Sequence, residues 1–365
     1  MRLIGTLCVL IGIGVQANGQ FRKYSNEFLN IGAGARSLGM GGANVASSSG
    51  ANASYWNPAL LSTVKDNPDV SLMHAEYFTG IGKYDYGSIA FPINNNKRTI
   101  GFSLMRFGID DIPNTLYLVD ADGSVNYNNL ETFSSADYAF MLSMSQIVKT
   151  GDDYQLSMGG NVKVIRRNIG SFAKAWGFGI DAAVHYKKKN WQLGAVLRDA
   201  TSTFNTWSFT FTDREKEVLY LTNNDIPTQS TEMTAPRLWL GGGYTFKFNE
   251  KLSLLTELML DLSFDGKRNT VIKSDFANVD PRAGAELNFN DALYVRAGIG
   301  NFQQGLKDGD TTNMKKVWIY QPSFGAGFRI KNVKIDYAYT NLSNQSSPLY
   351  THVVSLGFNI IKKEK

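Results

Sequence analysis

Few residues of this sequence combine the type and the spacing that chemistry at a site requires. His74, His185 and His352 are the only histidines, and they lie too far apart in the chain to indicate a zinc site. The only cysteine, Cys8, belongs to the first apolar segment, so no thiolate site is expected. The glycines from residue 32 onward do not form Gly-x-Gly-x-x-Gly, because Ser37 replaces the third glycine. We therefore expect no catalytic residue, no metal and no cofactor, and we do not expect an enzyme.

One polar stretch has a partial calcium-binding pattern. It reads "DADGSVNYNNLE" and places Asp120, Asp122, Asn126 and Glu131 close together. Its glycine, Gly123, comes too early for an EF-hand loop, whose sharp turn needs glycine at the sixth position. We interpret the stretch as a solvated external loop rather than as a metal site.

The composition and the first residues predict an exported protein. Met1-Arg2 is followed by "LIGTLCVLIGIGVQANG", and this cationic start, short apolar core and small-residue end are typical of a secretory signal peptide. We predict a signal peptide over 1–19, cleaved after Gly19. The 365 residues have a formal charge of +5 with scattered basic residues, so no nucleic-acid partner is expected. No later window is apolar enough for a membrane-spanning helix.

Alternation between apolar and small or polar residues dominates the chain after residue 68. From Trp176 one face reads Trp, Phe, Ile, Ala, Val and Tyr, whereas the other face carries glycines, Asp181 and His185. This period of two predicts a β-strand between two environments. Many such runs reach the nine to eleven residues, roughly, that a tilted strand needs to cross a bilayer. We count about 14 strands, a number found in outer-membrane barrels.

Charged residues also fall on the small-residue face of these strands. Unpaired charges in a dry interior are costly, so we expect these residues to pair with one another or with the segment before the first strand. They are Arg237, Lys247, Glu257, Asp261, Arg296, Lys334 and Asp336.

The connections between the strands alternate in length. After every second strand the link is short, as in "NNNKR", "KTGDD" and "NEK". Several of the other links are long and polar, at about 110–134, 200–235, 265–279 and 303–318, and this division is typical of outer-membrane barrels. We therefore predict an all-β fold, a transmembrane antiparallel β-barrel over 68–365, in the outer membrane of a Gram-negative bacterium.

The segment before the barrel is rich in small residues. It reads "GAGARSLGMGGANVASSSGANASYWNPAL", which is too apolar for a solvated linker and too poor in large side chains for a core of its own. A barrel of about 14 strands is wider than its own side chains can fill, so it must hold water, a ligand or a plug. We predict that residues 20–67 form a hatch inside the lumen, in which Asn-Pro starts a turn or short helix. The motif residues of this hatch are Gly39, Gly41, Gly42, Asn57 and Pro58.

The stretch "NEFLNIGAGARSLGMGGANVASSSGANASYWNPALL", residues 26–62, resembles the start of the PorV/PorQ family, and that of PorV more than that of PorQ. This family is in turn similar to the FadL-type outer-membrane barrels, in which a small-residue segment with Asn-Pro-Ala forms a hatch before fourteen strands. In this chain "SSSGANAS" replaces the acidic pair that often precedes Asn-Pro-Ala, so no role of those acids is transferred.

The resemblance implies a non-enzymatic role in type IX protein secretion. PorV-like proteins associate with the large translocon barrel, receive cargo that has a C-terminal signal domain, and pass it to a surface attachment machine. The partners implied are this translocon barrel, such cargo and the lipid of the outer membrane. Residues of the external loops are the candidate contacts, although aromatic residues there could also anchor the loops at the membrane surface. The candidates are Asp110, Asp111, Tyr117, Trp207, Phe209 and Phe211.

A FadL-like transporter of hydrophobic small molecules is the alternative function. It would require an apolar pocket and a lateral opening, for which Gly241-Gly242-Gly243 is a candidate kink. A diffusive porin is disfavoured, because the hatch would block the lumen.

Overall fold

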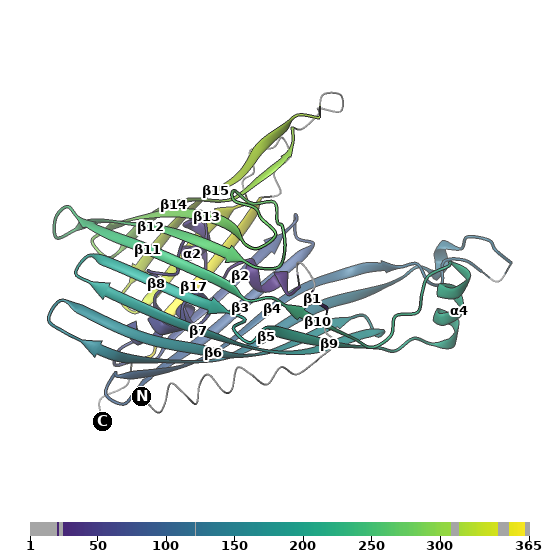
Figure 1. Cartoon of the computed structure of the whole chain (residues 1–365), viewed down its shortest axis with the longest axis horizontal. Coiled ribbons are helices and arrows are strands. Elements are labelled where there is room, and N and C mark those ends of the chain that lie inside the picture. The colour runs from purple at the N-terminus through teal and green to yellow at the C-terminus, as the bar shows by residue number, and fades with distance from the viewer. Residues whose placement is uncertain (1–19, 22–24, 121, 308–313, 342–349, 362–365) are drawn as a thin grey trace.

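A single closed sheet forms the wall of the molecule (Figure 1). The computed structural model describes residues 20–21, 25–120, 122–307, 314–341 and 350–361. The sheet closes because its last strand pairs with the first wall strand. The sheet has 17 strands among the described residues, of which the two-residue β1 (Gln20–Phe21) is a parallel addition. The other sixteen form fourteen antiparallel wall strands, because β8 and β9 together form one wall strand and β10 and β11 together form another. The expected transmembrane barrel is confirmed.

The wall strands follow one another around the barrel in chain order. Each therefore pairs with its neighbours in the sequence, which keeps every connection local. The strands are β2 (Asp69–Tyr77), β3 (Gly82–Ile93), β4 (Arg98–Asn114), β5 (Glu131–Thr150), β6 (Tyr154–Ile169), β7 (Ala173–Lys188), β8 (Trp191–Arg198), β9 (Thr203–Phe209), β10 (Ser230–Thr234), β11 (Arg237–Lys247), β12 (Leu252–Ser263), β13 (Asn278–Phe289), β14 (Leu293–Leu306), β15 (Lys316–Ile330), β16 (Val333–Thr340) and β17 (Thr351–Asn359).

The two faces of the wall differ as the alternation predicts. Asp181 on β7 is buried toward the lumen, whereas Trp176 and Phe178 on the same strand are 58% and 40% exposed on the outside. On β12, Glu257 is buried and the adjacent Leu258 is 67% exposed. An apolar outer face and a buried, partly charged inner face are what a lipid-facing barrel wall requires.

Short turns and long connections lie at opposite ends of the barrel (Figure 1). One end has turns of two to four residues, such as 94–97, 151–153 and 331–332. The other end carries the β4–β5 hairpin, helix α4 (Asp213–Leu221) and the β14–β15 hairpin. In outer-membrane barrels the short turns are periplasmic and the long loops are external, so this second end is the external one.

The long loop expected at 200–235 is only partly a loop, and this expectation was wrong. β9 and β10 lie within it and extend the wall, because β7 pairs with β9 as well as with β8, and β9 pairs with β10. The sequence of β9, "TFNTWSF", alternates in residue type, and this period of two is a strand signal. The expected 110–134 loop is also shorter, since β4 continues to Asn114 and β5 begins at Glu131.

Residues 25–64, the described part of the hatch that is enclosed by the wall, fill the lumen. They form the short helices η1 (Glu27–Asn30), α2 (Ala35–Gly39), η2 (Gly50–Asn52), α3 (Ala53–Trp56) and η3 (Pro58–Thr63). Phe28, Tyr55 and Trp56 from this segment belong to one buried cluster with inward-facing wall residues such as Tyr84 and Trp239. The main apolar core therefore lies inside the barrel, between the hatch and the wall.

The first part of the chain lies outside this description. The predicted signal peptide, residues 1–19, is not among the described residues, so the division into 1–19, 20–67 and 68–365 stays a prediction. Among the helices that the structure describes, none is both long and apolar enough to span a membrane.

Candidate functional site

One side of the hatch touches the wall backbone to backbone. A Cβ atom added to Gly39 would stand 3.0 Å from the Cα atom of Gly325 on β15, and one added to Gly41 would stand 2.6 Å from the backbone nitrogen of Ile299 on β14. A Cβ atom on Gly298 would overlap the backbone of Gly41. Only residues without a Cβ atom let two backbones approach this closely. We call this contact between 39–41 and β13–β15 the seat.

The Asn57-Pro58 pair positions another part of the hatch. Asn57 Oδ1 accepts a hydrogen bond from the backbone N–H of Ala59 (3.0 Å), and Asn57 Nδ2 donates to the carbonyl oxygen of Val45 (2.8 Å). Pro58 occupies the first position of η3, where its missing N–H costs no helical hydrogen bond. The pair therefore begins a short helix and ties it to the preceding segment.

Charged wall residues pair with one another and with the hatch, as expected. Arg36 of the hatch makes two hydrogen bonds to Glu286 on β13, from Nε at 2.8 Å and from Nη2 at 2.9 Å. Arg296 on β14 lies 2.5 Å from Glu286 and 2.7 Å from Asp336 on β16. The two guanidinium groups and the two carboxylates balance each other, which allows all four to be buried.

The remaining predicted lumen charges divide into two cases. Glu257 accepts a hydrogen bond from the backbone N–H of Ala46 in the hatch (2.7 Å), and Lys334 lies 3.9 Å from Asp69. Lys247, in contrast, is exposed at the end of β11. Its expected place in the interior was wrong, because the strand leaves the lumen before it ends.

A cavity of about 750 Å³ lies at the external end of the lumen, above the hatch. Asn30 and Leu38 of the hatch contribute to its floor, and Tyr77, Phe302 and Ile319 contribute apolar walls. Side-chain amides and hydroxyl groups from the wall strands and the external connections also line it, together with the charged residues Glu27, Arg237, Arg268, Asp280 and Arg282. A concave site with an apolar surface and a few polar groups has the general form of a small-molecule site.

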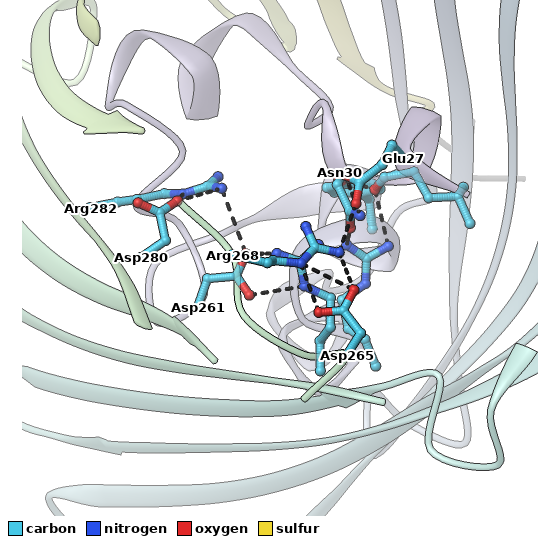
Figure 2. Close-up of polar contacts among 11 residues, drawn as sticks. Glu27, Asn30, Asp261, Asp265, Arg268, Asp280 and Arg282 are labelled. Atoms are coloured by element: carbon cyan, nitrogen blue, oxygen red, sulfur yellow. Dashed lines mark hydrogen bonds and ion pairs between the residues drawn. The ribbon is translucent and has the colours of Figure 1, made fainter. Parts of the chain in front are cut away.

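Arg268 connects an external loop to the hatch at this cavity (Figure 2). Its Nη2 lies 3.0 Å from Oε1 of Glu27 at the start of η1, and its Nε donates to Asp265 in its own loop at 2.8 Å. Asn278 Oδ1 accepts from the backbone N–H of Arg268 (2.8 Å), and Asn30 Nδ2 donates to Glu27 (3.0 Å). We call Glu27, Asp265 and Arg268 the latch, because they join the loop after β12 to the hatch.

Burial and charge act in opposite directions on the latch. Burial alone would lower the pKa of Arg268, but the hydrogen bond with Asp265 and the charges of Glu27 and Asp265 outweigh it and raise this pKa. Burial alone would raise the pKa of Asp265, but the hydrogen bond and charge of Arg268 outweigh it and lower this pKa. Both groups are therefore ionised at neutral pH.

A second charged group lies beside the latch on the wall (Figure 2). Asp261 on β12 and Asp280 on β13 are cross-strand partners, so their two carboxylates face the lumen side by side. Arg237 donates two hydrogen bonds to Asp261 (3.1 and 2.8 Å), and Arg282 lies 3.3 Å from Asp280 and 3.6 Å from Asp261. Gly42 of the hatch leaves room for Arg282, since a Cβ atom there would stand 2.8 Å from its Nη1.

The wall strand formed by β8 and β9 is irregular at residues 199–202, where the backbone N–H of Ala200 still donates to the carbonyl oxygen of Ile180 on β7 (2.8 Å). Asp199 has a left-handed backbone (φ 52°), and Lys163 on β6 lies 2.5 Å from its carboxylate and 2.8 Å from that of Asp181. These buried ion pairs lie at the irregular segment. The candidate kink at Gly241–Gly243 is wrong, because these glycines pair in regular register with both β8 and β12.

Three of the six predicted partner contacts lie on or near the β4–β5 hairpin. Asp110 and Asp111 belong to β4 rather than to a loop, and Asp110 pairs with Lys83 at 2.9 Å. Tyr117 lies in the connection between β4 and β5, with the guanidinium carbon of Arg214 5.0 Å from its ring centre. A role of these residues in partner binding stays a prediction.

The other three, Trp207, Phe209 and Phe211, form an aromatic ladder. Ring centres of Trp207 and Phe209 are 6.2 Å apart, and those of Phe209 and Phe211 are 6.4 Å apart, with nearly parallel planes in both pairs. Phe172 stacks on Phe211 at 5.8 Å, and the buried Trp207 donates a hydrogen bond to Glu232. Placing Trp207 and Phe209 in an exposed loop was wrong, because they lie on β9, whose alternate positions share one face.

The loop with the partial calcium pattern folds back on itself. Asp120 accepts hydrogen bonds from Asn126 and Asn129, each at 2.8 Å, and Asp122 accepts from the hydroxyl group of Ser124 at 2.6 Å. These carboxylates are thus used in the turns of the loop itself. Within the described ranges, no group of three or more His, Cys, Asp or Glu residues is placed to hold a metal ion.

The latch has no recognisable pattern in the sequence. Glu27 is an acidic residue at the start of the hatch, and Arg268 is a basic residue in a polar connection. Neither belongs to a periodic pattern, and 241 positions separate them in the chain. Only the opposite charges of the two residues could have indicated the pairing, and that signal is shared by many other pairs.

Solved structures similar to this chain span nearly its whole length. The toluene transporter TbuX of Ralstonia pickettii matches with a TM-score of 0.55 and 14% identity, covering 90% of this chain and 99% of that chain. The CymD monoaromatic hydrocarbon channel matches with a TM-score of 0.54 and 12% identity, covering 92% and 98%. The toluene transporter TodX of Pseudomonas putida matches with a TM-score of 0.53 and 14% identity, covering 90% and 98%. No family model and no curated protein matches the sequence.

The fold is therefore that of the FadL-like outer-membrane β-barrels, and the protein is located in the outer membrane of a Gram-negative bacterium. At this level of identity the similarity shows the fold alone. These neighbours are named as transporters and channels. The narrower resemblance to PorV/PorQ stays a prediction.

Proposed function

We propose that this protein is an outer-membrane transporter of hydrophobic small molecules, which enter from the external side. The cavity above the hatch carries this proposal, because its volume of about 750 Å³ lies within the usual range of small-molecule sites and the hatch forms its floor. Neighbours in fold whose names refer to toluene or to monoaromatic hydrocarbons support the same class of substrate.

The cavity lining suits a mainly apolar molecule. Tyr77, Phe302 and Ile319 offer ring and aliphatic surfaces, from which a hydrophobic molecule displaces water favourably. The charged groups that line the cavity are all in ion pairs. Arg268 pairs with Glu27 and Asp265, Arg282 pairs with Asp280, and Arg237 pairs with Asp261. A charged substrate would have to compete with these existing ion pairs, whereas an uncharged one would not.

Passage beyond the cavity requires the hatch to move. The contact of the latch with the hatch, between Arg268 and Glu27, is partly exposed, since the Glu27 side chain is 36% exposed, and an ion pair of this kind contributes about 1 kcal/mol or less. The seat is a backbone contact without intervening side chains, so it resists displacement more strongly. We therefore propose that a bound molecule loosens the hatch first at the latch.

Uptake of labelled toluene by intact cells tests this function. A host that lacks its own hydrocarbon channels would express the full chain, and uptake should exceed that of cells with an empty vector. Gln321→Trp places a large ring in the cavity and should reduce uptake several-fold. Phe324→Trp, on the outer face of the same strand and 55% exposed, is the matched control and should not. Equal uptake with and without the protein would contradict the proposal.

A second candidate function, a partner barrel in type IX secretion, is favoured by a different observation. The β4–β5 hairpin and α4 extend the external end of the molecule beyond the barrel rim (Figure 1), where a partner protein could bind. Together with the resemblance of residues 26–62 to PorV, this supports contacts with the translocon barrel or with cargo that has a C-terminal signal domain.

Purification in mild detergent separates the two functions. Co-purification of the translocon or of cargo would support secretion, whereas a bound hydrophobic molecule without a protein partner would support transport. A deletion strain that exports all proteins with C-terminal signals normally would contradict the secretion function for this chain.

A further inference from the structure

The external end of the barrel carries a projecting lobe that the transport function does not use. We define the acidic lobe as residues 110–120, 122–131 and 210–229, which include the tip of the β4–β5 hairpin and helix α4. β4 pairs with β3 only as far as Ile109, so its last five residues, Asp110–Asn114, stand beyond the neighbouring strand. At about 3.4 Å per residue this extension measures roughly 17 Å. Figure 1 shows α4 beside the tip of this hairpin, at the end opposite to the short turns.

Internal contacts hold the acidic lobe in one arrangement. The aromatic ladder continues from Phe211 through Phe172 to Phe133 on β5, with ring centres 5.8 and 5.2 Å apart. Helix α4 begins with a capping box, in which Thr212 and Glu215 satisfy each other's backbone N–H groups. These contacts join the β4–β5 hairpin, the β6–β7 turn and α4. A surface that is ordered before binding loses less entropy when a partner binds.

Large apolar side chains are exposed on this ordered lobe. Tyr127 is 76% exposed, Tyr220 is 80% exposed and Leu221 is 73% exposed. Further exposed apolar residues of the lobe are Val119, Val125, Leu130 and Ile226. Several exposed apolar side chains on one projecting element are typical of a protein-binding or membrane-binding surface.

The charge of the lobe distinguishes between these two kinds of surface. Its residues include nine Asp and Glu against two basic residues, Arg214 and Lys216, which gives a formal charge of −7, or −6 when Lys83, the partner of Asp110, is counted, in a chain whose total is +5. Over 110–131 no lysine or arginine occurs. Phosphate-bearing lipid headgroups repel such a surface, and the projection of the lobe carries α4 away from the bilayer. A positively charged protein surface is attracted to it and is steered toward it.

We propose that the acidic lobe is a docking surface for a protein partner whose contact face is basic around an apolar centre. Tyr127, Tyr220 and Leu221 supply the apolar contacts, and the carboxylates of the lobe select a basic partner and align it. The inference goes beyond the transport function. It specifies the binding surface for the secretion function, and it rests on that function only for the identity of the partner. The lobe and its charge are present in this chain whichever of the two functions is correct.

Photo-crosslinking in the native outer membrane tests the proposal on the full chain. p-Benzoylphenylalanine replaces Tyr127 or Tyr220, and in a control it replaces Phe276, which is 82% exposed in the connection after β12. We expect a protein crosslink from the two lobe positions that exceeds that from Phe276 at least tenfold. Mass spectrometry of the crosslinked peptide should show a net positive contact segment.

Charge reversal provides the second measurement. The variant Glu131→Lys/Glu217→Lys/Asp225→Lys should reduce the crosslink at least tenfold. The matched variant Asp152→Lys/Glu250→Lys reverses exposed acids of the short turns at the opposite end and should leave the crosslink unchanged. The crosslinked partner, once purified, should bind the barrel in lipid nanodiscs at least tenfold more weakly when the salt concentration rises from 50 to 500 mM. The reason is that salt screens the attraction between charges, whose Debye length falls from about 30 Å at 0.01 M to about 3 Å at 1 M.

Several outcomes would overturn the proposal. They are a crosslink to lipid alone, a contact peptide without net positive charge, a crosslink that survives charge reversal, and no crosslink above that of Phe276. Heat-modifiable migration in electrophoresis confirms that each variant is folded. Toluene uptake by the same variants separates this result from the transport function, because lobe variants leave the cavity residues unchanged.

Discussion

The hatch is held in two different ways at its two sides. At the seat, Gly39 and Gly41 meet the wall at Gly298 and Gly325, and backbone touches backbone. At the cavity on the external side, which we call the mouth, the latch joins the hatch to an external loop through charged side chains. Arg268 contacts both Glu27 of the hatch and Asp265 of its own loop. One contact depends on the absence of side chains, and the other depends entirely on side chains.

This difference indicates which side of the hatch can respond to the outside. A close-packed contact has no alternative arrangement nearby, because any shift produces an overlap or a void. A partly exposed ion pair such as Arg268–Glu27 can exchange its partner for solvent at a cost of about 1 kcal/mol or less. The seat therefore fixes the position of the hatch, and the latch is the part that a ligand or a neighbouring loop can release.

Overlap at the seat should produce the largest effect. Gly298→Val adds a Cβ atom and two methyl groups where the backbone of Gly41 already lies, and backbone on both sides leaves little room to relax. We expect the free energy of unfolding in detergent to fall by about 3 kcal/mol, the upper end of the usual overpacking range. Urea titration monitored by heat-modifiable migration measures it.

The matched control for this variant is Gly242→Val. Gly242 faces outward, and the nearest atom to an added Cβ is the flexible Cδ2 of Leu193 at 3.5 Å. This variant should change stability by less than about 1 kcal/mol, as is usual for surface positions. If both variants are equally destabilised, the backbone contact at the seat is no more sensitive to an added side chain than the outer face of the wall.

The seat and the wall could be predicted from the sequence because both depend on regular signals. A period of two in runs such as that from Trp176 predicts which side chains face lipid. Small residues in both the hatch and the inner faces indicate that the two approach closely. The pairing of inward charges such as Glu257 and Asp261 also follows, because a buried charge requires a partner.

The mouth could not be predicted in the same way. Arg268 lies in a connection without periodicity, so nothing in the sequence indicates that it reaches Glu27. Trp207 and Phe209 are a different case, because β9 does alternate in residue type, but over only seven residues within a long polar stretch. Irregular connections are positioned by tertiary contacts, and such contacts leave no local pattern in one sequence.

Removal of the buried ion pair beside the seat should produce the next largest effect. Arg36→Met leaves Glu286 with Arg296 as its remaining partner. We expect a loss of about 2 to 3 kcal/mol, below the full cost of an unpaired buried charge because one partner remains. The double variant Arg36→Met/Glu286→Gln should recover part of this loss in the same urea titration. A double variant that is less stable than either single variant would contradict this account.

Release of the latch should affect the hatch more than the barrel. Arg268→Gln removes the charge that joins Asp265 to Glu27, and we expect the hatch to open roughly fivefold more often, a change of about 1 kcal/mol. A cysteine introduced at Ile31, which lines the cavity, reports opening through its rate of maleimide labelling. Lys251→Gln, in a short turn at the opposite end, is the control and should leave the rate unchanged. Equal labelling in all three proteins would show that the latch does not hold the hatch.

The smallest expected effect is the pH dependence of the latch. The pKa of Asp265 is lowered in the folded protein, so its interaction with Arg268 contributes fully above the ordinary carboxyl pKa of about 4 and is lost as the pH falls through the lowered value. Asp265→Asn should therefore cost up to about 1 kcal/mol at pH 6, and this cost should be smaller at pH 2.5. Thermal unfolding of the original protein and of the variant at both pH values measures this cost. The other carboxyl groups titrate in both proteins, so their effect cancels in the difference. If the cost of Asp265→Asn grows at low pH instead, Arg268 does not stabilise this carboxylate. The latch would then not be held by charge, and it would not differ from the seat in this respect.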